Sequence, residues 1–341
     1  MKDLARYSGK AAEAAKARPS PAPVPATQQQ SAPAVQHIRI SDEEAGQRID
    51  NFLLRICKGV PKSHVYRVLR SGQVRVNKGR IDQTYRLQKD DVVRIPPVRV
   101  AQVSNAYVPA AEFKILLEDG HLLVIDKPAG VAVHGGSGIS FGVIEQLRAS
   151  RPDAKFLELV HRLDRDTSGV LLLAKKRSAL VNMHEQIRAG EIDKRYFALV
   201  HGNWKNEKQH VRLPLFKYLT ANGERRVRVQ EDGQVSHTIF TRLKNYAGYT
   251  LLEAELKTGR THQIRVHLSA SGFPIVGDDK YGDFEVNRAL HKEQAEHTAF
   301  KRMFLHAHQI TFVHPFSGKP VTLRADLPPD CVRFLDSLIR A

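Results

Sequence analysis

The sequence predicts an α+β protein in which a mixed, largely antiparallel sheet makes up the larger part. Strand-like apolar runs dominate residues 113–341, among them 122–125, 170–174, 196–200 and 250–256. In this part strands outnumber and precede helices, a pattern typical of α+β folds. Two short amphipathic helices and a small strand come earlier, so a chain of 341 residues is expected to hold two domains.

Two segments are expected to lie outside these domains. Residues 1–36 consist mainly of Ala, Pro, Gln and Ser, with almost no large apolar side chains. Such a segment cannot bury enough surface to offset the entropy lost on ordering, so it is interpreted as a disordered tail. Residues 98–112 show little periodicity and are interpreted as a linker.

Residues 46–97 are predicted to form a small α/β domain. Its first helix carries apolar residues at i, i+3, i+4 and i+7, namely Ile49, Phe52, Leu53 and Ile56. Gly59 and Pro61 end that helix, and a second begins at about Lys62. The second helix is expected to bury Val65, Val68 and Leu69. Strands at 74–79 and 92–95 follow, the first running into a turn.

The charge is concentrated in this small domain. The chain has 53 Lys and Arg against 36 Asp and Glu, a formal net charge of +17, which favours a polyanion or an anionic membrane surface as partner. Residues 46–96 hold twelve Lys and Arg and four Asp, or +8 of that total. A solvated face is the alternative, but this density favours contact with nucleic acid. The residues expected to make it are Lys62, Arg67, Arg70, Arg75 and Lys78.

Several classes of protein are disfavoured. No stretch approaches the roughly 18 consecutive apolar residues of a membrane span, and the N-terminus lacks the apolar core of a secretory signal. Cys57 and Cys331, far apart in sequence, fit a reducing compartment such as the cytoplasm. A P-loop is absent, and the glycines at 135–138 lack the context of a dinucleotide fold, so no cofactor is expected.

The segment from His161 to Gly169, HRLDRDTSG, is the first with catalytic potential. It lies between apolar runs that end at Val160 and begin at Val170, which predicts a polar loop between two buried strands. Loops mounted on rigid strands commonly carry catalytic groups. The alternative is a surface turn held by Asp and Ser side chains. Asp164 is the carboxylate of interest.

The second segment, residues 257–268, reads KTGRTHQIRVHL. It predicts a strand that ends near Gly259 and a helix with Thr261 as N-cap and Gly272 just past its end. Arg265 then falls in the early turns of the helix. An adjacent Arg lowers a carboxylate pKa by roughly one to three units, so Arg265 is a candidate partner for a buried Asp.

Tyr196 and the histidines could serve other roles. Tyr196 shares a strand face with Ala198 and Val200; such a Tyr usually packs in a core, but small neighbours leave its ring free to stack on a base. His262 and His267 are five residues apart, about 140° around a helix, unlike the i, i+4 pair of a zinc site. No metal site is therefore expected.

The small domain resembles the S4 RNA-binding domain through Arg70 to Lys78, RSGQVRVNK. A helix-turn-helix reader of DNA opens similarly, but more helix or a wing should follow its second helix. Here a Gly-rich strand and turn follow directly.

Five ordered motifs from about Arg48 to the C-terminus resemble the RluA-type pseudouridine synthases. They are DKPAG at 126–130, HRLDRDTSG at 161–169, KRY at 194–196, GRTHQIRVH at 259–267 and LHA at 305–307. The resemblance implies the pseudouridine synthase fold and an isomerase of uridines in large-subunit (23S) ribosomal RNA. The protein is expected to be a monomer that needs no cofactor.

The resemblance also implies roles for four residues. Asp164 would be the essential carboxylate, Arg265 its ion-pair partner and Tyr196 the aromatic residue against the target base; Arg162 would fill the gap left by the flipped nucleotide. In the implied reaction, uracil is detached from the ribose at N1 and reattached through C5. Asp164 could either attack C1′ or remove a C2′ proton.

Two alternative functions are a non-catalytic ribosome-associated S4 protein and a metal-dependent hydrolase. A protein that only binds RNA needs no Asp, Tyr and Arg in these three contexts. The sequence also lacks the spacing of ligands that a metal-dependent hydrolase requires.

Overall fold

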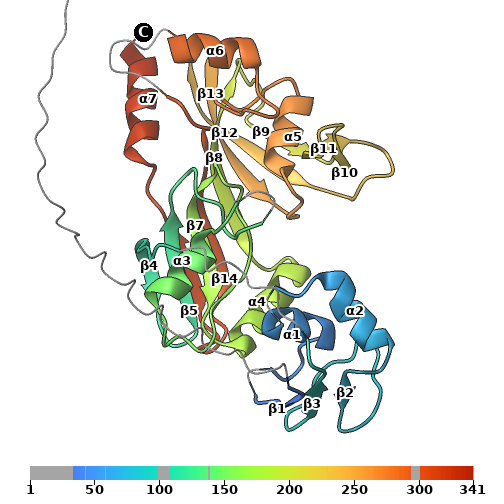
Figure 1. The fold of residues 1–341 in the computed structure, drawn as a ribbon. Coiled ribbons are helices and arrows are strands. Elements are labelled where there is room, and N and C mark those ends of the chain that lie inside the picture. Colours follow the sequence, from blue (N-terminus) through green and yellow to red (C-terminus); the bar gives the residue numbers. More distant parts are fainter. Residues whose placement is uncertain are drawn as a thin grey trace, which may run out of the picture.

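The computed structural model describes residues 34–42, 44–57, 59–98, 108–136, 139–292 and 300–340 (Figure 1). Residues 1–33 of the predicted tail and 99–107 of the predicted linker lie outside these ranges. No helix in the described ranges is long and apolar enough to cross a membrane.

The N-terminal module contains two helices and a three-stranded antiparallel sheet. The helices are α1 (Ile49–Ile56) and α2 (Lys62–Arg70), and the strands, in the order β1-β3-β2, are β1 (Gln36–Arg39), β3 (Val92–Ile95) and β2 (Arg75–Val76). As predicted, α2 buries Val65, Val68 and Leu69. The inclusion of Ile56 in the apolar face of α1 was wrong: it is the last residue of the helix and its side chain is exposed.

Two features of this module were not predicted. β1 pairs with β3 along its whole length, so the sheet takes up Gln36, which had been assigned to the tail. β2 is only two residues long because Asn77 and Lys78 adopt left-handed φ values of 49° and 68°. The Asn77 side chain stabilises this turn, since its Nδ2 donates to Asp91 Oδ1 at 2.7 Å and its Oδ1 accepts from Val92 N at 2.9 Å.

The described part of the larger region is built on a ten-stranded mixed sheet. Its main path runs β4-β5-β7-β14-β8-β13-β12-β9, with β15 paired to β14 and β6 to β7. The strands are β4 (Lys114–Glu118), β5 (Leu122–Lys127), β6 (Glu158–Leu159), β7 (Ser168–Ala174), β8 (Asp193–His201), β9 (Lys208–Val211), β12 (Thr238–Tyr246), β13 (Tyr249–Leu256), β14 (Leu305–Val313) and β15 (Pro320–Arg324). Within this sheet the described pairing of β7 with β14 is parallel, and the other described pairings are antiparallel. The predicted α+β class with a largely antiparallel sheet is confirmed.

Helices and a separate hairpin surround this sheet. The helices are α3 (Val143–Ser150), α4 (Arg177–Ala189), α5 (Gln263–Ala270), α6 (Phe284–Lys292) and α7 (Pro329–Arg340), and the hairpin is β10 (Leu215–Leu219) with β11 (Arg225–Val229). Alternate residues of β5 and β7 enter two different cores, for example Leu171 in one and Leu172 in the other. Because both faces are buried, these strands read as continuous apolar runs.

The parallel pairing of β7 with β14 depends on Gly169. Its φ is +110°, and a Cβ built there would lie 2.2 Å from the Ala307 carbonyl oxygen. A side chain would therefore push β14 away from β7. Ser168 Oγ also lies 2.8 Å from His306 Nδ1, which ties the two strands at the point where the 161–167 loop enters β7.

The predicted helix cap at Thr261 was wrong. α5 begins at Gln263 with His262, not Thr261, at its N-cap. The Gln263 side chain supplies the local bonds instead: its Oε1 accepts from Arg260 N at 2.9 Å and from Thr258 Oγ1 at 2.8 Å.

Candidate active site

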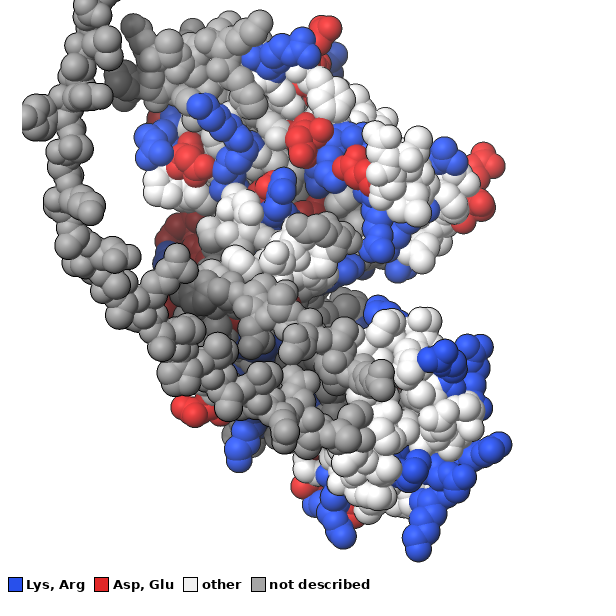
Figure 2. All heavy atoms as spheres, viewed as in Figure 1, with Lys and Arg blue, Asp and Glu red and all other residues white. Residues whose placement is uncertain are grey.

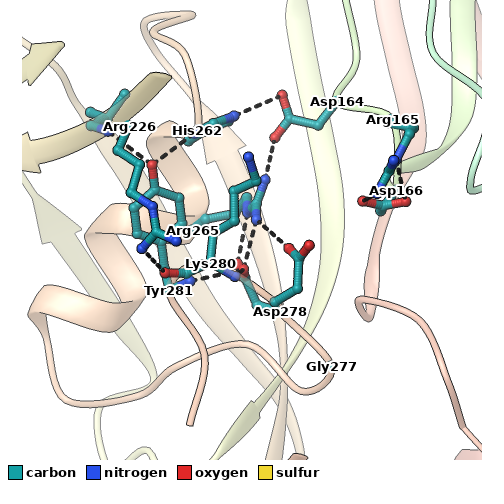
Figure 3. A network of polar contacts seen from close by, with 12 residues as sticks. Asp164, Arg165, Asp166, Arg226, His262, Arg265, Gly277, Asp278, Lys280 and Tyr281 are labelled. Atoms are coloured by element: carbon teal, nitrogen blue, oxygen red, sulfur yellow. Dashed lines mark hydrogen bonds and ion pairs between the residues drawn. The ribbon is translucent and has the colours of Figure 1, made fainter. Parts of the chain in front are cut away.

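Asp164 and Arg265, 101 positions apart in sequence, lie in contact in the fold (Figure 3). Asp164 is part of the loop between β6 and β7, and its side chain is 28% exposed. Arg265 is the third residue of α5, and its Nη1 donates to Asp164 Oδ2 at 3.1 Å. The structure thus brings together the carboxylate and the cation that the sequence singled out.

Arg265 is held more tightly by Asp278 than by Asp164. Its Nε and Nη2 donate to the two oxygens of Asp278 at 2.7 and 2.6 Å, and Nη2 also reaches Asp279 at 3.4 Å. Burial acts to lower the pKa of Arg265, but the hydrogen bonds and charge of Asp278, with those of Asp164, raise it above its usual value. Arg265 is therefore a permanent cation with a fixed orientation.

Asp278 was missed from the sequence. Burial raises its pKa, but the bonds from Arg265 and from two backbone N–H groups outweigh this and hold the pKa below its usual value. The available signal was Gly277, which precedes it: a Cβ there would lie 2.0 Å from Arg302 O, and φ is +73°. Such a glycine marks a tight backbone approach, although nothing local links it to Arg265.

His262 approaches the other oxygen of Asp164. Its Nε2 lies 3.8 Å from Asp164 Oδ1, and its Nδ1 lies 2.8 Å from the Tyr281 hydroxyl. From the sequence, His262 was excluded as a metal ligand, and no other role was predicted for it or for Tyr281. Within the described ranges no group of three or more His, Cys, Asp and Glu could hold a metal ion.

Tyr196 packs in the core and also lines the cavity that contains Asp164. It lies on β8 with 7% of its surface exposed, on the same face as Ala198 and Val200. Burial, and secondarily the charge of Asp164, raise the pKa of its hydroxyl. The residue therefore presents a protonated phenol beside the carboxylate.

The cavity around Asp164 has a volume of about 840 Å³ and a strongly cationic wall. That volume falls in the usual range for ligand sites. Among the described residues its wall holds one carboxylate, Asp164, and six Lys and Arg: Arg162, Arg165, Arg188, Lys194, Arg260 and Arg265. Such a charge balance favours an anionic ligand.

Lys194 is a further cavity residue, for which the sequence predicts no role. It shares the β8 face of Tyr196, and its Nζ lies 3.6 Å from where a Cβ on Gly259 would be. Burial lowers its pKa. In the part of the chain that the structure describes, no hydrogen-bond or ion-pair partner reaches this ammonium, so it is available to an anionic group.

Lys127 connects the DKPAG motif to the Asp164 loop. Its buried Nζ donates to the carbonyl oxygens of Pro128, Val131 and Arg165, at 2.7, 2.8 and 3.0 Å. The last of these residues directly follows Asp164. Lys127 therefore restrains the loop at the residue after Asp164.

The five cations predicted to bind nucleic acid are all exposed on the N-terminal module. Lys62, Arg67 and Arg70 lie on α2, and Arg75 and Lys78 on β2 and the following turn. Figure 2 shows Lys and Arg projecting from the outer side of this module, with few Asp or Glu among them. The module also contacts α4, because Arg177 Nε donates to Ala45 O at 2.8 Å.

Comparison with known proteins identifies the family. A family profile described as RNA pseudouridylate synthase matches residues 121–270, and the S4 domain profile matches residues 47–93. Ribosomal large subunit pseudouridine synthase C of Pasteurella multocida (strain Pm70) is 53% identical over 312 residues, 89% of this chain and 94% of that protein. The chain belongs to the RNA pseudouridylate synthase family. This pseudouridine synthase is accordingly an isomerase that acts on RNA.

Other relatives of this pseudouridine synthase support the same family assignment. The protein of the same name from Escherichia coli (strain K12) is 52% identical over 316 residues, 91% of this chain and 98% of that protein. The solved structure of human RNA Pseudouridylate Synthase Domain Containing 4 has a TM-score of 0.55 at 28% identity and covers 66% of this chain and 93% of its own. The resemblance to RluA-type pseudouridine synthases with an S4 domain is confirmed, and both bacterial relatives are named ribosomal large subunit pseudouridine synthase C.

Proposed function

We propose that this pseudouridine synthase isomerises specific uridines in 23S ribosomal RNA, with Asp164 as the catalytic carboxylate. The observation that carries this proposal is the ion pair between Asp164 and Arg265 inside a cationic cavity lined by Tyr196. The relatives from Pasteurella multocida and Escherichia coli, both named for the ribosomal large subunit, support the choice of RNA.

Asp164 reacts in its ionised form, whether it attacks C1′ or removes the C2′ proton. Arg265 orients the carboxylate, because its Nη1 donates to Asp164 Oδ2 at 3.1 Å. Asp278 holds Arg265 from behind, so the cation is in place before RNA arrives. Meanwhile the Tyr196 ring packs against the uracil while the base is detached, rotated and rejoined through C5.

The uridine must leave its stack to reach Asp164, at a cost of a few kcal/mol. Arg162 is exposed at the cavity rim, where its guanidinium can fill the gap in the RNA. The cations of α2, β2 and the following turn bind phosphates and offset the cost of flipping. In this account the enzyme works as a monomer in the cytoplasm, without a cofactor.

Mapping pseudouridines in 23S RNA tests this function. Carbodiimide-blocked reverse transcription compares cells with and without the gene, and cells complemented with wild type or Asp164→Asn. We expect specific stops to vanish on deletion and to return with wild type alone. Unchanged stops in the deletion strain would contradict the RNA assignment, and restoration by Asp164→Asn would show a non-catalytic, binding role.

A further inference from the structure

The polar network behind Asp164 fixes the proton on His262. Figure 3 shows His262 between Tyr281 and Asp164, with Arg265 beside it. Tyr281 is rigidly placed, because its hydroxyl accepts from Val227 N at 2.9 Å and the Arg265 guanidinium lies 5.1 Å from its ring centre. Burial raises the pKa of Tyr281 to about 12, so the hydroxyl keeps its hydrogen at pH 7.

That hydrogen determines which nitrogen of His262 is protonated. The backbone N–H of Val227 can only donate, so it occupies an oxygen lone pair of Tyr281 and leaves the phenolic hydrogen to another acceptor. Among the described residues His262 Nδ1, at 2.8 Å, is the acceptor within reach. Burial lowers the pKa of His262, although Asp164 acts to raise it, so the ring carries one proton. With Nδ1 accepting, that proton sits on Nε2.

We propose that His262 is a positioning residue whose Nε2–H directs Asp164 Oδ1 toward the target ribose. The two oxygens of Asp164 have unequal partners: Oδ2 faces the full charge of Arg265 at 3.1 Å, whereas Oδ1 faces the neutral N–H at 3.8 Å. Oδ1 is thus the freer oxygen, and the one that reacts. Contacts of this kind are often long without substrate and shorten in the complex. The inference rests on the proposed role of Asp164.

The backbone of His262 supports this role. It is at the N-cap of α5 with φ +53°, one of the positive-φ residues other than glycine in the described chain. Left-handed backbone is uncommon outside glycine, although Asn, Asp and His adopt it more readily than other residues. This conformation places both ring nitrogens against partners on either side, Tyr281 and Asp164.

Two substitutions separate positioning from backbone fit. Asn suits the left-handed backbone, but its amide reaches only as far as Nδ1, whereas the longer Gln places an amide N–H near the position of Nε2. A positioning role therefore predicts that His262→Gln keeps more activity than His262→Asn. A purely structural role predicts the reverse, because Gln is the poorer fit to positive φ.

The experiment measures kcat and KM by tritium release from C5-labelled RNA, with thermal unfolding of each variant as a check. For His262→Asn we expect kcat to fall roughly 10- to 100-fold with KM nearly unchanged, as for a misplaced reacting group. The kcat of His262→Gln should lie within about tenfold of the wild-type value. Tyr281→Phe removes the hydroxyl that fixes the tautomer of His262, so it should also lower kcat. Tyr246→Phe, on β12, is the matched control and should retain wild-type kcat.

Wild-type kcat in His262→Asn and Tyr281→Phe, or more activity in Asn than in Gln, would overturn the inference. Asp164→Asn is assayed alongside. If it is inactive while the His262 variants behave as a structural role predicts, the inference fails and the proposed function stands. If Asp164→Asn is active, the proposed function fails and the inference falls with it.

Discussion

Asp164 and Asp278 share the single guanidinium of Arg265, and the sharing is unequal. Asp278 takes two hydrogen bonds and is fully buried, while Asp164 takes one and stays open to the cavity. Without Asp278, Arg265 would be a buried cation whose neighbouring anion, Asp164, is partly exposed. The bidentate pair with Asp278 thus satisfies Arg265 and leaves Asp164 open to the cavity.

Asp278→Asn should lower both stability and activity. Removing one member of a buried pair typically costs about 3 to 5 kcal/mol. Here it leaves Arg265 with the partly exposed Asp164 and the exposed Asp279 as anionic partners. Arg265 also loses its anchor, so kcat should fall. Urea unfolding and tritium release measure the two effects.

Asp279→Asn is the matched control, since Asp279 reaches the same Nη2 at 3.4 Å but is 59% exposed. Its unfolding free energy should stay within about 1 kcal/mol of wild type. Equal effects of the two substitutions would show that Asp278 has no special part in holding Arg265.

Among the elements, β7 marks the end of the Asp164 loop, and its parallel pairing with β14 holds that end in place. Gly169→Ala should be strongly destabilising, by about 3 kcal/mol or more, because the new Cβ meets Ala307 backbone at 2.2 Å. Gly190→Ala is the control: φ is +75° but no atom lies within 4 Å, so conformational strain of about 1 kcal/mol is expected. Chemical unfolding of both variants measures the difference, and similar losses would contradict the close approach of β14.

His306 on β14 should make stability depend on pH. It is fully buried, and burial lowers its pKa to about 4 from a usual 6.5. Between these values the unfolded chain binds a proton that the folded chain does not, so stability is lost as pH falls below 6.5. From pH 7 to pH 5 this residue should account for about 2 kcal/mol. Urea unfolding at both pH values should show a smaller loss in His306→Gln than in wild type; equal losses would exclude His306 as the source.

Elements with strong periodicity could be predicted from the sequence, and the contacts between them could not. α2, β3, β5 and β7 follow apolar patterns that are local in the chain. Asp164 and Arg265 were found because each lies in a recognisable motif. Asp278, Tyr281 and the orientation of His262 depend on segments that meet only in the folded chain, and β1 carries too short an apolar pattern to distinguish it from the tail.

At the scale of the whole molecule, the N-terminal module has a core of its own. Its buried residues form a cluster separate from those of the larger sheet. The module's cations point outward, so their effect on RNA binding should come through phosphates and counterion release.

Replacing Lys62, Arg67 and Arg70 by Gln should weaken RNA binding and flatten its salt dependence. Each lost phosphate contact reduces the slope of log affinity against log salt by roughly 0.7 to 0.9. Salt titration on one RNA fragment measures this. The control replaces Lys155, Lys319 and Arg333, exposed cations outside the module, and should change the slope less. Identical slopes for wild type and the α2 variant would show that these charges do not touch RNA.

The chemistry of Asp164 is tested most directly by Asp164→Asn on purified RNA. The amide keeps the shape of the carboxylate and an oxygen for Arg265, but it can neither attack nor accept a proton as a carboxylate does. Tritium released from C5-labelled uridine reports isomerisation, and RNA affinity is measured in parallel. We expect release to be abolished with affinity nearly unchanged. Release within about tenfold of wild type would contradict catalysis by Asp164, since losing a reacting group costs far more than that.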